Sequence, residues 1–124
     1  MAQSPIKRDF TIKRRADFPL RLIFKDSNNT KVNLTGFTVA AEVYDEGRTK
    51  KFADFNVVYT DRPNGTIDLK LVDTDTVNFY LDKLSYDVKL TDPSGIQMYY
   101  LEGTLFINEG YTVWVHLILF LLLK

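Results

Sequence analysis

Apolar and polar residues alternate with period two between residues 17 and 44, and this alternation is the feature that most constrains the fold. The apolar positions form two runs, Phe18, Leu20, Leu22 and Phe24, then Phe37, Val39, Ala41 and Val43. In an extended strand, side chains two residues apart lie on the same face. Residues 26–30 between the runs, DSNNT, are rich in turn formers. The stretch therefore predicts two half-buried strands joined by a loop.

The same alternation recurs along most of the chain. Further alternating runs are Phe10 to Ile12, Phe55 to Tyr59, Ile67 to Leu71, Tyr86 to Leu90 and Met98 to Ile107. Turn formers separate the runs, including Asn64-Gly65, which is among the strongest hairpin signals. About seven or eight short strands with turns every eight to twelve residues predict an all-β antiparallel sandwich.

Three local features refine this prediction. Pro19 has no amide hydrogen, so its strand is expected to lie at a sheet edge or to begin with a bend. Residues 74–82 are expected to form at most one short helical turn, capped by Asp73 or Thr74, with Val77 and Tyr80 on its apolar face. Gly103 is expected to form a β-bulge in the last strand.

Composition and order along the chain indicate one domain with two unusual ends. With 124 residues, 45% hydrophobic content and no cysteine, the chain can bury a core without disulfides. Residues 1–16 are predicted to be a basic arm with an edge strand, residues 17–110 the β-sandwich, and residues 111–124 an apolar tail. The first residues lack the apolar run of a secretory signal, and the absence of cysteine fits a reducing compartment.

A net charge of zero conceals an asymmetry. Residues 1–25 contain seven Lys or Arg and two Asp or Glu, a balance of +5, and residues 26–124 contain nine and fourteen, a balance of −5. Solvated surface charge that forms part of a contact with an acidic protein neighbour is the favoured interpretation, and nucleic acid is a weaker alternative because no reader motif accompanies the basic residues. The predicted contact residues are Lys7, Arg8, Lys13, Arg14 and Arg15.

Residues 111–124 are almost continuously apolar. The run is too short to cross a bilayer, which needs roughly 20 residues as a helix. Three interpretations are open: a last strand buried on both faces, a tail inserted into a neighbouring subunit, or a shifted reading frame. If the tail contacts another subunit, Trp114 and Phe120 are its expected anchors, because aromatic residues dominate such interfaces.

The residues offer little chemistry. The single histidine, His116, lies in the apolar tail, and no nucleophile, phosphate loop or cysteine accompanies it. Asp73-Thr74-Asp75 lacks the glycine and the distal glutamate of a calcium loop. We therefore predict no catalytic residue, no metal and no cofactor. Tyr44, Tyr59, Tyr99 and Tyr100 could line a carbohydrate-binding face, although tyrosine is also an ordinary strand residue.

The order of the motifs resembles a known group of proteins. Asp26-Ser27-Asn28-Asn29, Val32-Asn33-Leu34-Thr35-Gly36, Asn64-Gly65-Thr66-Ile67-Asp68-Leu69, Tyr86 to Asp92 and Leu101-Glu102-Gly103-Thr104-Leu105 follow one another. This series resembles the small immunoglobulin-like domains of tailed bacteriophages, and is similar to the N-terminal domain of the baseplate upper protein. The resemblance covers residues 17 to 109. The basic N-terminus and the apolar end depart from it.

The resemblance implies an immunoglobulin-like fold and a non-enzymatic structural role in a virion. The expected place is a tail, baseplate or fibre attachment, with other virion proteins and copies of the same chain as partners. A capsid decoration protein and a carbohydrate-binding, host-recognition module are the alternatives. In each case the expected location is the virion, on its tail or capsid surface, after synthesis in the host cytoplasm.

Overall fold

The computed structural model describes residues 5–109, which form nine strands, one 3-10 turn and one short helix. The strands are β1 (Ile6–Lys7), β2 (Phe10–Lys13), β3 (Phe18–Ile23), β4 (Thr38–Tyr44), β5 (Lys51–Asp54), β6 (Asn56–Asp61), β7 (Thr66–Leu71), β8 (Lys83–Thr91) and β9 (Gln97–Asn108). The 3-10 turn, η1, is Arg62–Asn64, and the helix, α1, is Asp73–Thr76.

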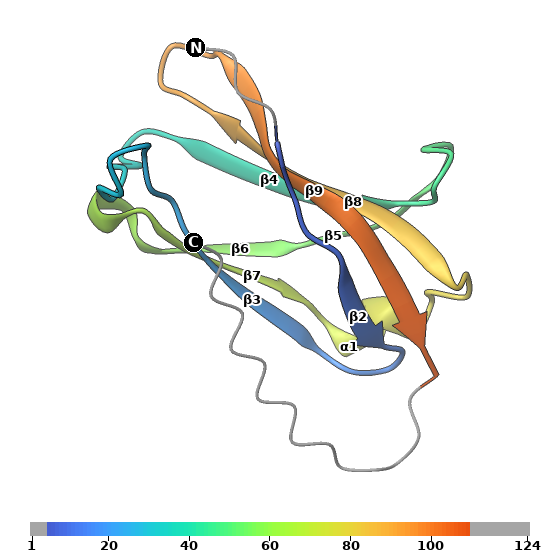
Figure 1. Ribbon diagram of the computed structural model, residues 1–124. Helices are drawn as coiled ribbons and strands as arrows, with labels where there is room; N and C mark the ends of the chain where they lie inside the picture. The colour runs from blue at the N-terminus through green and yellow to red at the C-terminus, as the bar shows by residue number, and fades with distance from the viewer. Residues whose placement is uncertain (1–4, 110–124) are drawn as a thin grey trace.

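The strands form two layers (Figure 1). The larger sheet has the order β1-β9-β8-β4-β5, with β2 also paired to β9, and the smaller sheet has the order β3-β7-β6. In an immunoglobulin domain, strands B, E and D form part of one sheet and strands C, F and G form the other. Here β3, β7 and β6 occupy the first set of places, and β4, β8 and β9 the second. The chain is therefore an all-β, immunoglobulin-like β-sandwich, as expected.

The two alternating runs of residues 17–44 do form strands, but the strands lie in different layers. β3 is buried at Phe18, Leu20 and Leu22, and β4 is buried at every second residue from Val39. Among the strands of residues 5–109, β3 pairs only with β7, so Pro19 lies on an edge strand, one of the two predicted positions. Period two thus identified the buried face of each strand correctly, whereas the sheet to which each strand belongs depends on distant pairing.

Aromatic rings fill the centre of the space between the layers. The ring centroid of Phe10 lies 5.5 Å from that of Phe18 and 5.8 Å from that of Tyr86. Phe55 lies on the other side of Tyr86, at 6.2 Å. Burial of one such side chain stabilises a fold by about 1.5–3 kcal/mol, so this cluster contributes strongly to holding the layers together.

The N-terminal strands belong to the larger sheet. β1 and β2 both run parallel to β9, with Ile6 opposite Leu101 and Phe10 opposite Leu105. The side chains of Phe10 and Ile12 are buried in the common core. Residues 6–13, which the sequence assigned to an arm with an edge strand, are therefore continuous with the sandwich of residues 17–109.

Gly103 serves a different purpose from the predicted bulge. The link between β1 and β2 runs beside β9 at this residue, and a Cβ added to Gly103 would lie 1.8 Å from the carbonyl oxygen of Arg8. Around it, the Arg8 amide donates to the Glu102 carbonyl at 2.9 Å, and the Thr104 amide donates to Asp9 Oδ1 at 2.8 Å. A glycine is required because only its missing side chain permits this approach of two backbones.

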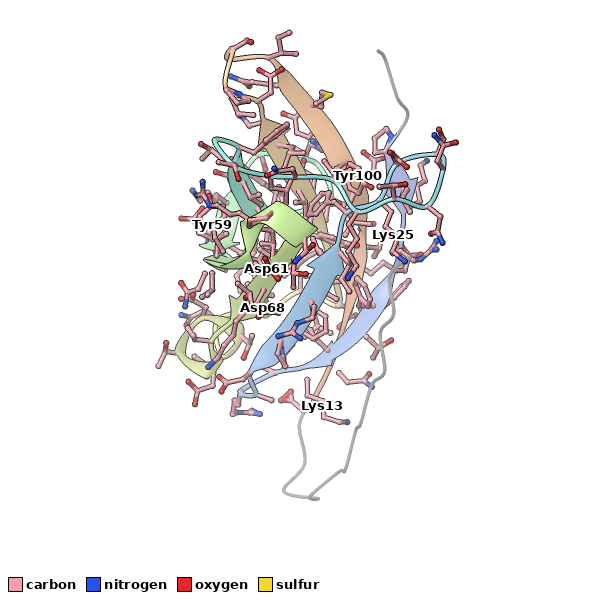
Figure 2. All side chains as sticks on the ribbon, turned by 90° about the vertical axis from the view of Figure 1, so that its left-hand side faces the viewer. Lys13, Lys25, Tyr59, Asp61, Asp68 and Tyr100 are labelled. Carbon is pink, nitrogen blue, oxygen red and sulfur yellow. The ribbon has the colours of Figure 1, made fainter. Side chains whose placement is uncertain are left out.

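The bulge in β9 lies at Tyr100. Leu101 pairs with Val88 and Tyr99 pairs with Lys89, so Tyr100 has no partner on β8. Its ring packs 4.4 Å from that of Phe24, and its hydroxyl donates to the Lys25 carbonyl at 3.4 Å. The bulge therefore turns the side chain of Tyr100 toward the loop that follows β3. Figure 2 shows Tyr100 close to Lys25, which lies in that loop. The prediction of a bulge at Gly103 was wrong by three residues.

A single short helical turn forms, as predicted, but it is capped from elsewhere in the chain. α1 ends at Thr76, and its first amide, that of Asp73, donates to Asp17 Oδ1 at 2.8 Å. The cap is thus a distant carboxylate and not Asp73 or Thr74. The buried residues of this segment are Thr76 and Phe79, whereas Val77 and Tyr80 are exposed. Val77 and Tyr80 do not form a buried face because the helix ends at Thr76, before either residue.

The hairpin predicted at Asn64-Gly65 joins β6 to β7, which pair in antiparallel fashion. Its turn contains η1, and Gly65 takes the left-handed conformation with φ of 70°. β5, which was not predicted, pairs with β4 before the chain changes layer at Phe55 and enters β6. The Phe55 amide donates to the Ala41 carbonyl at 2.9 Å at this crossing.

Candidate functional site

The five basic residues predicted to contact a partner are spread along the N-terminal strands. Lys7 ends β1, Arg8 lies in the link that follows, and Lys13 ends β2. At the rise of an extended strand, Lys7 and Lys13 are about 20 Å apart. Figure 2 places Lys13 at the end of the sandwich near the β2–β3 turn. The structure therefore does not gather the five into one patch.

Arg14 and Arg15 are engaged within the chain. Arg14 Nε donates to the Phe79 carbonyl at 2.8 Å, and Arg14 Nη1 forms an ion pair with Glu109. Arg15 Nη2 binds the other oxygen of Glu109 at 2.8 Å. Arg14 is only 19% exposed. We call Arg14, Arg15, Phe79 and Glu109 the end clamp, because they tie the β2–β3 turn to the last described residue after β9.

An exposed aromatic cluster adjoins the end clamp. The ring of Phe52 lies 6.1 Å from Phe79 and 5.4 Å from Tyr80, which is 61% exposed. Lys50 Nζ lies over both outer rings, 5.1 Å from the centroid of Phe52 and 5.3 Å from that of Tyr80. Phe79 belongs to both groups, since its carbonyl binds Arg14 while its ring packs under Phe52. Sequence reasoning did not identify this cluster.

Trp114 and Phe120, the two predicted anchors in the apolar tail, lie outside the described residues, as does His116.

Two of the four tyrosines that could line a glycan face hold the backbone together instead. The Tyr59 hydroxyl accepts a hydrogen bond from the Val39 amide at 3.0 Å, and the Arg62 guanidinium lies 3.8 Å from the Tyr59 ring centroid. Tyr59 thereby joins β6 to β4 across the two layers. Tyr100 packs on Phe24, as described above.

The other two tyrosines, Tyr44 and Tyr99, line the same hollow on the outer face of the larger sheet. The hollow has a volume of about 270 Å³ and lies over β4, β8 and β9. We call it the outer hollow, and its lining residues are Ala40, Glu42, Tyr44, Arg48, Asp87, Lys89 and Tyr99. Sequence reasoning identified the tyrosines but missed the charged residues between them.

Strand register explains why these residues meet. Ala40 lies opposite Lys89, which lies opposite Tyr99, and Glu42 lies opposite Asp87. Residues 40, 42, 87 and 89 occupy the outward positions of their strands, whose alternate residues are buried. The alternation indicates that these residues face outward, but only the pairing places them side by side.

Two acidic groups of the hollow, the Asp87 carboxyl and the Tyr44 hydroxyl, have raised pKa values. Burial raises the pKa of Asp87, and the charge of Arg48, whose Nη1 lies 3.3 Å from Asp87 Oδ2, partly opposes this shift. A hydrogen bond with Glu42 raises the pKa of the Tyr44 hydroxyl. Lys51 binds Glu42 at 3.3 Å. The polar lining is thus held by neighbours on the same face.

Within residues 5–109, no group of three or more His, Cys, Asp or Glu side chains is placed to hold a metal ion. None of the helices in this part of the chain is long and apolar enough to cross a membrane.

Comparison with known proteins gives a likeness of fold. No family model matches the sequence, and no curated protein matches it. Among solved structures, the chain is similar to the filamin domain of Lin-41, with 16% sequence identity and a TM-score of 0.46. The match covers 81% of this chain and 84% of that chain.

Proposed function

We propose that this chain is a non-enzymatic structural protein of a tailed bacteriophage and acts through protein–protein contacts in a tail, baseplate or fibre attachment. Support for the phage assignment comes from the ordered motifs between residues 17 and 109, which resemble small immunoglobulin-like phage domains. The other virion proteins, and further copies of this chain, are the proposed partners.

The observation that carries the assembly role is the exposed aromatic cluster beside the end clamp. Tyr80 presents its ring at the surface and packs on the half-buried ring of Phe52, and Glu109 is tied to the same end of the sandwich through Arg14 and Phe79. The apolar sequence of residues 111–124 follows directly on this point. Aromatic side chains with a rigid support are typical anchors of protein interfaces. We therefore propose that this end of the sandwich contacts a neighbouring subunit.

The basic residues that remain at the surface contribute a second contact in this proposal. Lys7 and Arg8 are exposed on β1 and in the following link. Surface charges of this kind steer association and weaken with salt, because counter-ions screen them. Arg14 and Arg15 contribute as members of the end clamp, through their ion pairs with Glu109.

Sedimentation of the purified full chain tests the assembly role. We expect self-association of the full chain, and a monomer when the chain is cut after Gly110 or when Phe52 and Tyr80 are both replaced by serine. Replacement of the exposed Val58 by serine is the matched control and should leave association unchanged, since Val58 lies on β6 in the other layer. The role would be contradicted if the full chain, the cut chain, the double serine variant and the Val58 variant all sedimented alike and none of them captured another virion protein.

Immunogold electron microscopy tests the phage assignment, using virions produced from the genome that encodes the chain. Gold on tails or baseplates is the expected result. Gold on heads would favour the capsid decoration alternative. Virions that carry no label, and that contain no peptide of this chain by mass spectrometry, would overturn the assignment.

A further inference from the structure

We infer that the outer hollow is a binding site for a neutral sugar, a function beyond the proposed role in assembly. Its shape is the first argument. Ala40 has a small side chain at an outward position of β4, and larger side chains rise around it from β8, β9 and the β4–β5 loop. The resulting hollow of about 270 Å³ is bounded by tyrosines on β4 and β9.

The lining has the chemistry that sugar hydroxyls require. Glu42 and Asp87 accept hydrogen bonds, and Arg48 and Lys89 donate them, so each hydroxyl of a pyranose can find either kind of partner. Tyr99 is 50% exposed and offers a ring against which an apolar sugar face can pack.

The charges of the hollow favour a neutral ligand. Two carboxylates face two cationic side chains, which leaves a balance of zero. A phosphate or carboxylate ligand would meet Glu42 and Asp87, and an amine would meet Arg48 and Lys89. An uncharged polyol avoids both penalties, because like charges brought together in a partly buried site are costly.

The polar groups are already held in place before a ligand binds. Arg48 is bound to Asp87 at 3.3 Å, and Lys89 Nζ donates to Gln97 Oε1 at 3.1 Å. Preorganisation of this kind reduces the ordering cost of binding.

The loop that presents Arg48 is also fastened. Arg48 takes a left-handed conformation with φ of 58°, which is unfavourable for a residue with a side chain. Asp45 compensates by accepting hydrogen bonds from the Thr49 amide at 2.6 Å and the Lys50 amide at 3.1 Å. Since strain tends to be retained where it positions a functional group, the loop conformation is consistent with a role for the Arg48 side chain.

Saturation-transfer NMR on the full chain tests this inference. The probes are the methyl α- and β-glycosides of glucose, galactose, mannose and N-acetylglucosamine, each at roughly millimolar concentration, because single-sugar sites are weak. We expect at least one glycoside to bind, with an affinity that does not change with salt. Ala40→Phe, which fills the hollow from an outward position, and Tyr99→Ala should each weaken binding about tenfold or more.

Tyr80→Ala is the matched control, because Tyr80 is an exposed tyrosine of the aromatic cluster and does not line the hollow. Binding of none of the glycosides would overturn the inference. So would binding that Ala40→Phe and Tyr99→Ala leave intact, or that Tyr80→Ala removes equally. If Ala40→Phe abolishes self-association in sedimentation and no glycoside binds, the hollow is a protein contact and not a sugar site. If only the sugar-binding inference is wrong, the sedimentation results expected for the variants of Phe52 and Tyr80 remain the same.

Discussion

At Gly103 two segments that are distant in sequence approach each other closely. The β1–β2 link runs beside β9 there, and the Arg8 carbonyl occupies the space that a side chain would need. The same carbonyl accepts a hydrogen bond of 2.7 Å from the hydroxyl of Tyr86, a core residue of β8. Burial raises the pKa of this hydroxyl, so it stays protonated and remains a donor.

Gly103→Ala should therefore lower the free energy of unfolding by about 3 kcal/mol, the upper part of the range for overpacking, because the clash is with backbone. Urea unfolding followed by circular dichroism measures the change. Gly47→Ala is the control: its nearest heavy atom would be Thr49 Cγ2 at 3.8 Å, so a change within about 0.5 kcal/mol is expected. Equal stability of the two variants would show that β1 does not need this close approach.

Asp87 provides a prediction about pH. Burial raises its folded pKa above the ordinary value of 3.8, so the charged form costs free energy in the folded state. The cost is present at neutral pH and disappears as pH falls and the carboxyl is protonated. The Asp87→Asn variant should thus melt a few degrees above the parent at neutral pH. The difference in melting temperature should vanish once the pH falls below the ordinary pKa of an aspartate carboxyl. The lost ion pair to the exposed Arg48 contributes little.

Asp68 is the contrasting control. Its hydrogen bonds with Arg21 lower its pKa in the folded protein. The charged carboxylate therefore stabilises the fold above the ordinary pKa of aspartate, and this stabilisation is lost as the pH falls through the lowered pKa of the folded state. Asp68→Asn should therefore melt below the parent at neutral pH and approach it in acid. Thermal unfolding over a pH series distinguishes the two variants, and the same sign of change in both would refute the assignment.

At the scale of elements, the end clamp shows how a short turn secures a strand end. Arg14 reaches the carbonyl that follows α1 and the carboxylate that follows β9, and its own amide donates to the Asn108 carbonyl at 2.9 Å. A guanidinium can make these bonds in one plane from several donors, which lysine cannot do. The last residues of β9 therefore depend on a side chain from the opposite end of the described chain.

Arg14→Ala should lower the free energy of unfolding by about 1–3 kcal/mol, since hydrogen bonds to charged groups are lost. The amides of Ile107 and Asn108 should exchange faster in hydrogen-exchange NMR. Arg15→Ala is the matched control, because Arg15 is 53% exposed and only shares Glu109, so a smaller effect is expected. If the two variants exchange alike, the clamp does not hold β9.

At the scale of the whole molecule, pairing between the ends of the chain completes the larger sheet. Asp9 and Thr104, joined by a hydrogen bond, are 95 residues apart in sequence. Contacts at such separation make folding slow, because the chain pays loop-closure entropy before the contacts form. We therefore expect folding in milliseconds to seconds, with the β2–β9 pairing formed late.

Ile12→Val tests this order of events. The side chain is buried on β2, so removal of one methyl group should cost about 1 kcal/mol. If β2 docks after the transition state, stopped-flow circular dichroism should show faster unfolding with an almost unchanged folding rate. A change confined to the folding rate would place β2 in the folding nucleus instead.

Some elements could be predicted because their signals are local. Alternation identified the buried faces of β3, β4, β7 and β8, and Pro19 identified an edge. β5 was missed because it begins and ends with the charged residues Lys51 and Asp54, and only Phe52 and Ala53 between them are apolar. It forms a strand because β4 provides a partner, which no property of the four residues indicates.

The sequence by itself determined the class of the fold and the inward face of most strands, because a side chain's direction follows from period two within a strand. Tertiary structure decided the rest, because register and sheet order depend on partners far away in the chain. It placed Tyr59 and Tyr100 in backbone support, Arg14 and Arg15 in the end clamp, and Tyr44 and Tyr99 around one hollow. Residues of the same type thus acquired different roles through the strands beside them.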